Sequence, residues 1–199
     1  MLGFVILRLT MNKIVCVGRN YVEHIKELNN EIPSEPVYFM KPFSSIGEDI
    51  VLPGYSPMHY EGEICFLMGE RIKVGFGFDF TLREIQSELK KRGLPWERAK
   101  AFKNSAVFSD FVEFNDINAL GLEVYKNGEL VQKGDVSLMM YKPEWLLRDI
   151  DRIFGLNFGD IVMSGTPKGV GVVRSGDEFE GRILEGDKIL VSKKWRVDN

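Results

Sequence analysis

The stretch HYEGEICFLMG, residues 59–69, holds the pattern from which both the fold and the site follow. Its continuous apolar run, 64–68, is typical of a strand that is covered on both faces. The chain enters this run through Glu61 and Glu63, and side chains two residues apart in a strand point to the same face. Two carboxylates therefore lie side by side at the edge of a core, with His59 just before them.

Three arrangements would make this pair of carboxylates tolerable. In the first and commonest, the strand face that bears the carboxylates is solvated. In the second, lysine or arginine side chains pair with the carboxylates. In the third, a divalent cation lies between the two carboxylates. The cation needs a third oxygen ligand, and Asp79 is a candidate, because KVGFGFD (73–79) could form a strand that returns beside 61–68. Two Glu and one Asp without cysteine suit Mg²⁺ or Mn²⁺. The spacing alone does not decide between a solvated face and a metal site.

Composition narrows the class of protein. The chain has 199 residues, of which 44% are hydrophobic and 28% charged, as expected for one globular domain with a substantial core. The net charge of -3 predicts neither a nucleic-acid partner nor a basic membrane-binding patch. Cys16 and Cys65 lie in apolar runs and are expected to be reduced core residues.

The first ten residues are treated separately. MLGFVILRLT is apolar but interrupted by Arg8, and it is too short to span a bilayer. We expect residues 1–10 to be an extension or an edge strand, with 11–199 forming a single catalytic domain. Nothing else suggests targeting, so a cytoplasmic location is expected.

The remaining pattern is mainly β with a few short helices, an α+β class, and not an alternating βαβ array. Asn20 with Glu23, and Thr81 with Glu84, have the spacing of helix capping boxes. Gly93 suits the end of the second helix, and Asn127 with Gly128 suits a hairpin turn. The predicted helices are 20–28, 81–92 and 143–154; the predicted strands include 13–18, 160–163, 177–183 and 187–192, with a hairpin over 121–132.

Seven motifs occur along the chain in this order: CVGRNYVEH, SEPVYFMKP, HYEGEICFLMG, DFTLREIQ, KKRGLPWERAKAF, NGELVQ and GDIVMSGTPKGVG. Together they resemble the fumarylacetoacetate hydrolase family, and most closely its small acylpyruvase and oxaloacetate decarboxylase members. The resemblance runs from about Ile14 to Ile183. It implies the family's mixed β-sandwich roll, Mg²⁺ or Mn²⁺ as cofactor, and a homodimer.

The resemblance also assigns roles to individual residues. The family's metal ligands fall on Glu61, Glu63 and Asp79, and its catalytic groups fall on His24, Glu27 and Lys100. Substrate-binding positions fall on Arg83, Gln86, Gly165 and Thr166.

The residues themselves support these roles to different degrees. His24 and Glu27 are neighbours if their segment is helical, so the glutamate could orient the imidazole as a general base, although a simple surface pair would look the same. Lys100 could balance the charge of a metal site or stabilise an enolate, although most lysines are solvated. Arg83 could hold a carboxylate or pair with a glutamate of its own helix. His59 is expected to contact a ligand without binding the metal.

The loop GTPKGVG, 165–171, lacks the spacing of a nucleotide-binding P-loop, but its backbone N–H groups could hold a carboxylate.

The expected reaction is metal-dependent hydrolysis of acylpyruvates (2,4-dioxo acids) to pyruvate and a carboxylic acid. His24 would activate water, and the partner is a small 2-oxo or 2,4-dioxo acid. The alternatives are oxaloacetate decarboxylation or tautomerisation, an isomerase of the 2-hydroxyhepta-2,4-diene-1,7-dioate type, and a non-catalytic metal-binding protein.

Overall fold

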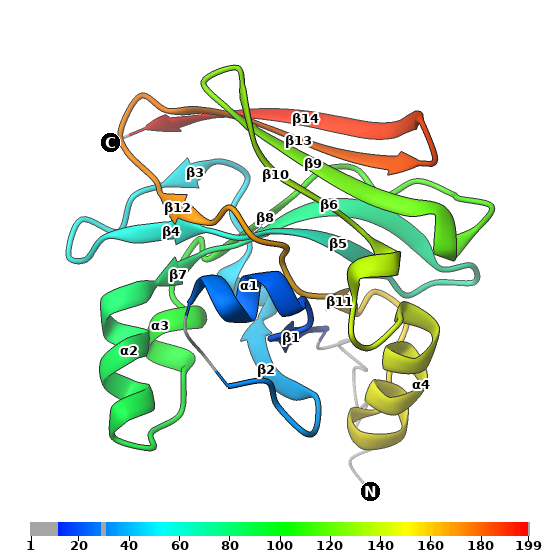
Figure 1. The fold of residues 1–199 in the computed structure, drawn as a ribbon, viewed down its shortest axis with the longest axis horizontal. Helices are drawn as coiled ribbons and strands as arrows, with labels where there is room; N and C mark the ends of the chain where they lie inside the picture. Colours follow the sequence, from blue (N-terminus) through cyan, green and yellow to red (C-terminus); the bar gives the residue numbers. More distant parts are fainter. Residues whose placement is uncertain (1–11, 29–30, 199) are drawn as a thin grey trace, which may run out of the picture.

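The computed structural model describes residues 12–28 and 31–198. The predicted extension or edge strand at 1–10 lies outside these residues. Within these described ranges, three sheets and four helices form the fold, which confirms the mainly β prediction. Figure 1 shows their arrangement. Among the described residues, none of the helices has the length and hydrophobicity needed to cross a bilayer.

The largest sheet carries the stretch 59–69 and contains both parallel and antiparallel pairs. β5 pairs with β6 in an antiparallel hairpin, as predicted, and β1 pairs with β11 in parallel. The strand order is β2 (Val37–Pro42), β1 (Lys13–Gly18), β11 (Ile161–Met163), β5 (Gly62–Leu67), β6 (Lys73–Asp79) and β8 (Ala106–Phe108).

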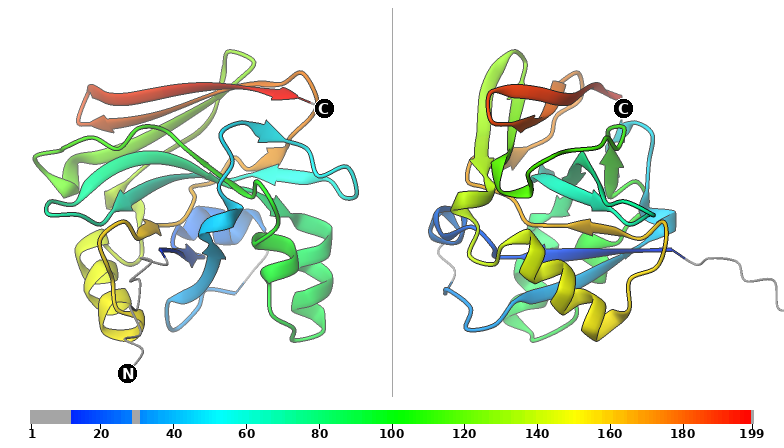
Figure 2. Two further views of the ribbon diagram at one scale, coloured as in Figure 1. Left: turned by 180° about the vertical axis from the view of Figure 1, so that it is seen from behind. Right: turned by 90° about the vertical axis from the view of Figure 1, so that its right-hand side faces the viewer.

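A second sheet covers one face of the β5–β6 hairpin and completes the sandwich (Figure 2). The predicted hairpin turn is confirmed, because Asn127 and Gly128 both adopt positive φ between its two strands. The strand order is β10 (Glu129–Asp135), β9 (Leu120–Lys126), β13 (Glu178–Glu185), β14 (Lys188–Asp198) and β3 (Ile50–Val51); β12 (Gly171–Val172), β4 (Met58–Tyr60) and β7 (Thr81–Leu82) form a third, small sheet.

Alternation along β6 separates the core from the site. Phe76 and Phe78 are fully buried and pack against Trp195 of the covering sheet. Gly181 permits this contact, since a Cβ there would lie 2.2 Å from Cε1 of Phe76. Asp79, the next residue along, points to the opposite face of the sheet. The aromatic core therefore fixes the strand whose last residue enters the site.

The helices lie at the ends of the large sheet, and two of them begin differently from the prediction. Asn20 does not cap α1, and Thr81 does not cap α2, because neither side chain bonds to the first turn. The backbone of Thr81 instead pairs with His59 in the small sheet. The helices are α1 (Val22–Glu27), α2 (Arg83–Lys91), α3 (Glu97–Lys100) and α4 (Pro143–Phe154), with single 3-10 turns at Phe43–Ser45, Ile117–Ala119 and Val136–Leu138.

Candidate active site

Three buried carboxylates meet where the β5–β6 hairpin leaves the core. Glu61 lies in the break between β4 and β5, Glu63 lies in β5, and Asp79 ends β6. The backbone N–H of Asp79 donates to the carbonyl of Glu61 at 2.9 Å, which sets the register. Their side chains are on one face, and one oxygen from each lies within 4.8 Å of the others. The solvated face is therefore excluded, since the three residues are only 5%, 2% and 1% exposed.

Cations from three other elements surround this triad. Nζ of Lys100, at the end of α3, lies 2.8 Å from Oε2 of Glu61 and 2.5 Å from Oδ2 of Asp79. Arg83, at the start of α2, donates to the other oxygen of Glu61. Lys41 of β2 lies 2.8 Å from Oδ1 of Asp79. Glu61 and Asp79 are thus compensated by protein side chains.

Glu63 is the member of the triad that has no such compensation. Its Oε2 accepts the backbone N–H of Gly165 at 2.7 Å, but no lysine or arginine in the described ranges forms an ion pair with it. Burial and the neighbouring charge of Asp79 raise the pKa of Glu63 well above its ordinary value. In contrast, Lys100 and Arg83 outweigh the effect of burial and hold the pKa of Glu61 well below its ordinary value.

This donor set fits a hard divalent ion. All three candidate ligand atoms are carboxylate oxygens, and the buried charge of Glu63 is the kind that a cation stabilises. The same donors suit Mg²⁺ and Mn²⁺ equally, so the identity of the ion stays a prediction.

His24 and Glu27 meet as the sequence predicts. Nδ1 of His24 lies 3.1 Å from Oε2 of Glu27, three residues later on α1. Oε1 of the same glutamate accepts the backbone N–H of Gly169 at 3.0 Å, so α1 is tied to the loop after β11. His24 is buried and lines the same cavity as the triad. The imidazole is therefore buried at the cavity while Glu27 is exposed, and the catalytic role of the pair remains a prediction.

The predicted substrate residues lie around the same cavity, but several of their polar groups already have partners. Arg83 donates to Oε1 of Gln86 at 2.9 Å, and both side chains line the cavity. The hydroxyl of Thr166 donates to the carbonyl of Gly62 at 2.8 Å. The N–H of Gly165 is bonded to Glu63 and is not free to hold a carboxylate. The prediction of free backbone donors is therefore wrong at this position.

Other residues of the site were missed by sequence reasoning. Lys41 is fully buried in β2, and nothing in its spacing distinguishes it from a solvated lysine. Asn20, predicted as a cap, instead bonds to the backbone of Tyr141 and Ser164. Lys90 and Trp96 also line the cavity, and only the helical period of α2 could have indicated the lysine.

His59 lies in β4, in the small sheet, and within the described residues it forms no hydrogen bond to the carboxylate triad. Burial and the charge of Arg83 lower the pKa of His59, against the charge of Glu61, so its contact with a ligand stays a prediction. The break at Glu61 separates β4 from β5, so the alternation assumed for a single strand does not hold across it.

The cavity has a volume of about 30 Å³, room for about one or two water molecules. Side chains around it must therefore move before a 2-oxo acid can enter. α1 contributes His24 and Ile25 to the lining of this cavity.

Comparison with known proteins shows the family of this chain. Residues 13–193 match the family model described as fumarylacetoacetate (FAA) hydrolase C-terminal. The chain belongs to the fumarylacetoacetate hydrolase family.

Two relatives of this chain are oxaloacetate tautomerases. The mitochondrial oxaloacetate tautomerase of Homo sapiens is 39% identical over 93% of this chain and 91% of its own. The oxaloacetate tautomerase YcgM of Escherichia coli is 38% identical over 87% of this chain and 91% of its own.

Solved structures of the fumarylacetoacetate hydrolase family agree with the fold. A crystal structure from Oleispira antarctica, provisionally described as a fumarylacetoacetate isomerase/hydrolase, has a TM-score of 0.91, 38% identity, and coverage of 94% and 93% of the two chains. Fumarylpyruvate hydrolase from Pseudomonas aeruginosa, in complex with Mn²⁺ and pyruvate, has a TM-score of 0.83 at 26% identity, covering 94% of this chain and 90% of its own. The mixed β-sandwich roll is therefore confirmed.

Proposed function

We propose that this chain is a metal-dependent keto–enol tautomerase of oxaloacetate. Relatives with that activity share 37–39% identity with nearly the whole chain. They favour the tautomerase alternative over the acylpyruvate hydrolase that the sequence analysis put first. The observation that carries the proposal is that the carboxylate triad, Lys100 and His24 all line one buried cavity.

The reaction moves one proton between C3 and the oxygen on C2, and an enolate is formed on the way. Glu61, Glu63 and Asp79 would hold Mg²⁺ or Mn²⁺, which supplies a Lewis acid that stabilises negative charge on that oxygen. Lys100 adds a positive charge at the same place, since its ammonium is already fixed between Glu61 and Asp79.

His24 is the proton carrier in this proposal. It takes a proton from C3 of the keto acid, which leaves the enolate, and the protonated imidazole then gives a proton to the oxygen on C2 to complete the enol. The reverse direction takes the proton from that oxygen and returns one to C3. Glu27 orients the imidazole through Nδ1, so the other ring nitrogen is the one that faces the substrate. Because Glu27 is bonded to Gly169, the position of the ring depends on the loop after β11.

Exchange of the C3 hydrogens with deuterated water tests this scheme. Proton NMR of oxaloacetate with enzyme and Mg²⁺ is expected to show loss of the C3 signal much faster than without enzyme. His24→Gln is expected to slow this exchange by about 100-fold or more, within the range for general acid–base catalysis. Exchange at the uncatalysed rate with the wild type would reject the proposal.

Acylpyruvate hydrolysis is the second candidate. It is supported by the similarity to a fumarylpyruvate hydrolase and by the His24–Glu27 pair, which also suits water activation. Release of pyruvate from acetylpyruvate distinguishes it, because tautomerisation releases no product. Pyruvate formed from oxaloacetate instead would indicate the decarboxylase alternative. A homodimer and a cytoplasmic location also remain predictions.

A further inference from the structure

One face of α2 lines the cavity with three polar side chains. Arg83, Gln86 and Lys90 lie at positions i, i+3 and i+7, which fall on one side of a helix. Arg83 and Gln86 bond to each other, and Arg83 also bonds to Glu61. These two residues are therefore engaged by the protein, whereas the third member of the face is not.

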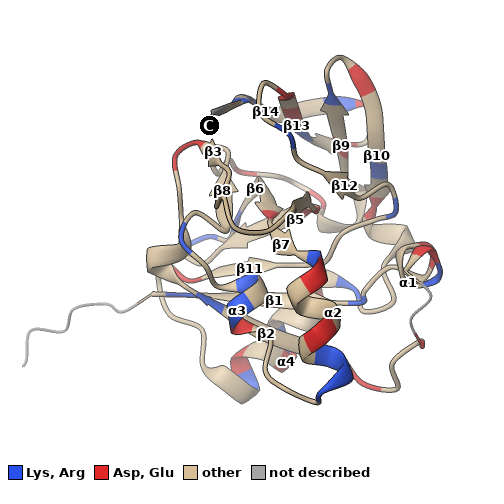
Figure 3. Cartoon of the chain, turned by 90° about the vertical axis from the view of Figure 1, so that its left-hand side faces the viewer, with Lys and Arg blue, Asp and Glu red and all other residues tan. Residues whose placement is uncertain are grey.

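Lys90 is half-buried, yet its ammonium has no hydrogen bond or ion pair with any residue of 12–28 or 31–198. Nζ instead lies over the ring of Trp96, 5.0 Å from its centroid. The next residue, Lys91, behaves as an ordinary surface lysine: its side chain is 73% exposed and pairs with Glu88 at 3.1 Å. Acidic residues lie along α2 between its basic ends (Figure 3), so surface partners are accessible in this helix.

The surroundings of Lys90 are strongly positive. Burial, and then the charges of Arg19, Arg83 and Lys100, lower the pKa of Lys90 to about 8. At neutral pH the ammonium is still mostly protonated. Since Lys100 and Arg83 are already matched by Glu61 and Asp79, the charge of Lys90 is an excess positive charge at the cavity wall. An anion bound there would offset it.

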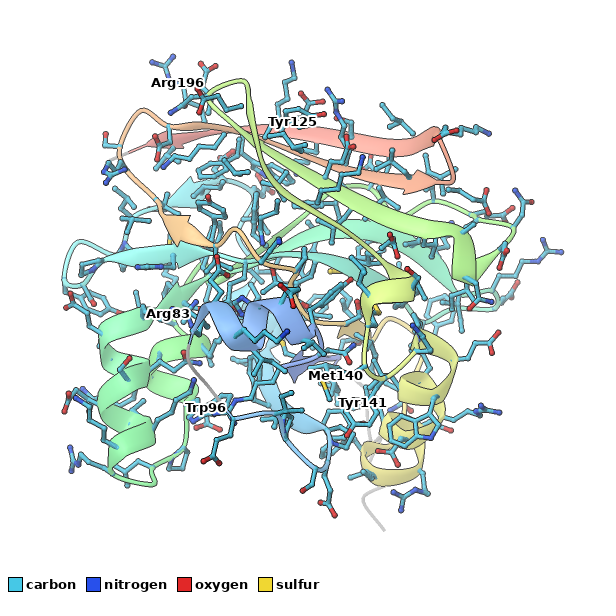
Figure 4. All side chains as sticks on the ribbon, viewed as in Figure 1. Arg83, Trp96, Tyr125, Met140, Tyr141 and Arg196 are labelled. Carbon is cyan, nitrogen blue, oxygen red and sulfur yellow. The ribbon has the colours of Figure 1, made fainter. Side chains whose placement is uncertain are left out.

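Trp96 gives this lysine a rigid support. The indole packs against Phe39 with ring centroids 5.9 Å apart, and it lies beside Gly18. The carbonyl of Trp96 accepts the N–H of Lys100 at 3.0 Å, so Trp96 is held at the start of the short helix α3, which ends at Lys100. Figure 4 shows Arg83 and Trp96 on the same side of the molecule, by α2 and β2.

Resting on the proposed tautomerase function, we infer that Lys90, supported by Trp96, binds the second carboxylate of a dicarboxylic 2-oxo acid. Lys90 would then be the residue that selects oxaloacetate-like dianions over monocarboxylates. The first carboxylate and the 2-oxo group need the triad side of the cavity, so the second carboxylate reaches the α2 wall, where the excess charge is.

Binding of a matched pair of 2-hydroxy acids tests this inference without turnover. Malate and lactate differ in the second carboxylate, and calorimetry with Mg²⁺ gives an affinity for each. Wild type is expected to bind malate about tenfold or more tightly than lactate, the range for one charged hydrogen bond. Lys90→Gln is expected to remove most of this preference without changing the affinity for lactate, and Lys90→Arg is expected to retain it.

Lys91→Gln is the matched control and is expected to behave as wild type, and thermal unfolding of each variant checks the fold. A wild type without a preference for malate, or a Lys90→Gln variant that keeps the preference, would overturn the inference. If the preference depends on Lys90 but the C3 hydrogens of oxaloacetate do not exchange, the dicarboxylate site stands and the tautomerase proposal fails.

Discussion

Nζ of Lys41 lies 2.8 Å from Oδ1 of Asp79, and the side chains of both residues are buried, at 0% and 1% exposure. The same ammonium donates to the backbone carbonyls of Phe80, Lys100 and Ser105. One buried cation therefore joins the end of β6 to α3 and to the loop before β8. This contact fixes the backbone that carries both Asp79 and Lys100.

Replacing Lys41 by methionine should cost much of the stability. The substitution keeps the length of the side chain but leaves Asp79 with one cation fewer in a buried place, and loss of one member of a buried ion pair typically costs about 3–5 kcal/mol. Urea denaturation measures the change. The control is Lys26→Met, whose exposed pair with Glu23 is expected to contribute less than about 1 kcal/mol. Equal effects of the two substitutions would contradict this role of Lys41.

Strand spacing predicted the pair Glu61 and Glu63 and suggested Asp79, whereas the catalytic and substrate-binding roles rest on the family resemblance. The segment 73–79 was predicted as a strand that returns beside 61–68, and it does pair with β5. The end of α2 could also be predicted from the sequence. Gly93 adopts a φ of 63°, and Leu94 donates back to Leu89 at 2.9 Å, the bond expected after a helix that ends in glycine.

Other features depend on contacts that are distant in sequence. Asn20 and Thr81 have the spacing of caps, but tertiary hydrogen bonds and strand pairing take precedence over local capping. Nothing in the sequence distinguishes the environment of Lys41 from that of Lys90. Only the fold shows that one meets a buried carboxylate and the other lies over an indole.

Asn20 is expected to stabilise the junction between β1 and α1. Its amide donates to the carbonyls of Tyr141 and Ser164 at 3.1 and 2.8 Å and accepts the N–H of Tyr141 at 2.8 Å. Asn20→Ala should leave these backbone groups unpaired and cost about 1–3 kcal/mol. Thermal or urea unfolding measures it. A loss under a few tenths of a kcal/mol would mean that Asn20 is only a local turn residue.

Metal binding is expected to depend on Glu63. Calorimetry with Mg²⁺ or Mn²⁺ should detect one binding site per chain. Glu63→Gln should lower the metal affinity by at least about 10–100-fold, because loss of a residue that only supports a metal ligand already lowers affinity by that much. The exposed Glu129, in the hairpin strand β10, provides the control substitution Glu129→Gln. Unchanged affinity in Glu63→Gln would remove the carboxylate triad as the metal site.

Asp160 should make stability depend on pH in the acid range. Its carboxylate accepts the backbone N–H groups of Lys13 and Asn157 and pairs with Nζ of Lys13 at 2.5 Å. Burial opposes ionisation, but these bonds prevail and lower the pKa of Asp160 below its ordinary value. The pKa of Asp160 is thus lower in the folded protein than in the unfolded chain, where it is about 3.9. The stabilisation by its carboxylate is therefore complete above about pH 3.9 and is lost as the pH falls through the folded-state pKa.

The variant Asp160→Asn isolates this contribution. It is expected to be less stable than wild type by about 1–3 kcal/mol at pH 7, and the difference should shrink toward pH 2 as the wild-type carboxyl takes up its proton. Guanidinium unfolding at each pH provides the measurement, with Asp187→Asn at an exposed turn as the control. A difference that stays constant with pH would show that the charge of Asp160 is not what stabilises the fold.

The most direct test of the proposed function follows the ultraviolet absorbance of the enol form of oxaloacetate as it relaxes to the keto form. We predict that wild-type protein with Mg²⁺ accelerates this relaxation, that EDTA abolishes the acceleration, and that Glu61→Gln shows little of it. Relaxation at the buffer rate, with or without metal, would contradict the proposal, and equal acceleration by Glu61→Gln would contradict the assignment of the carboxylate triad.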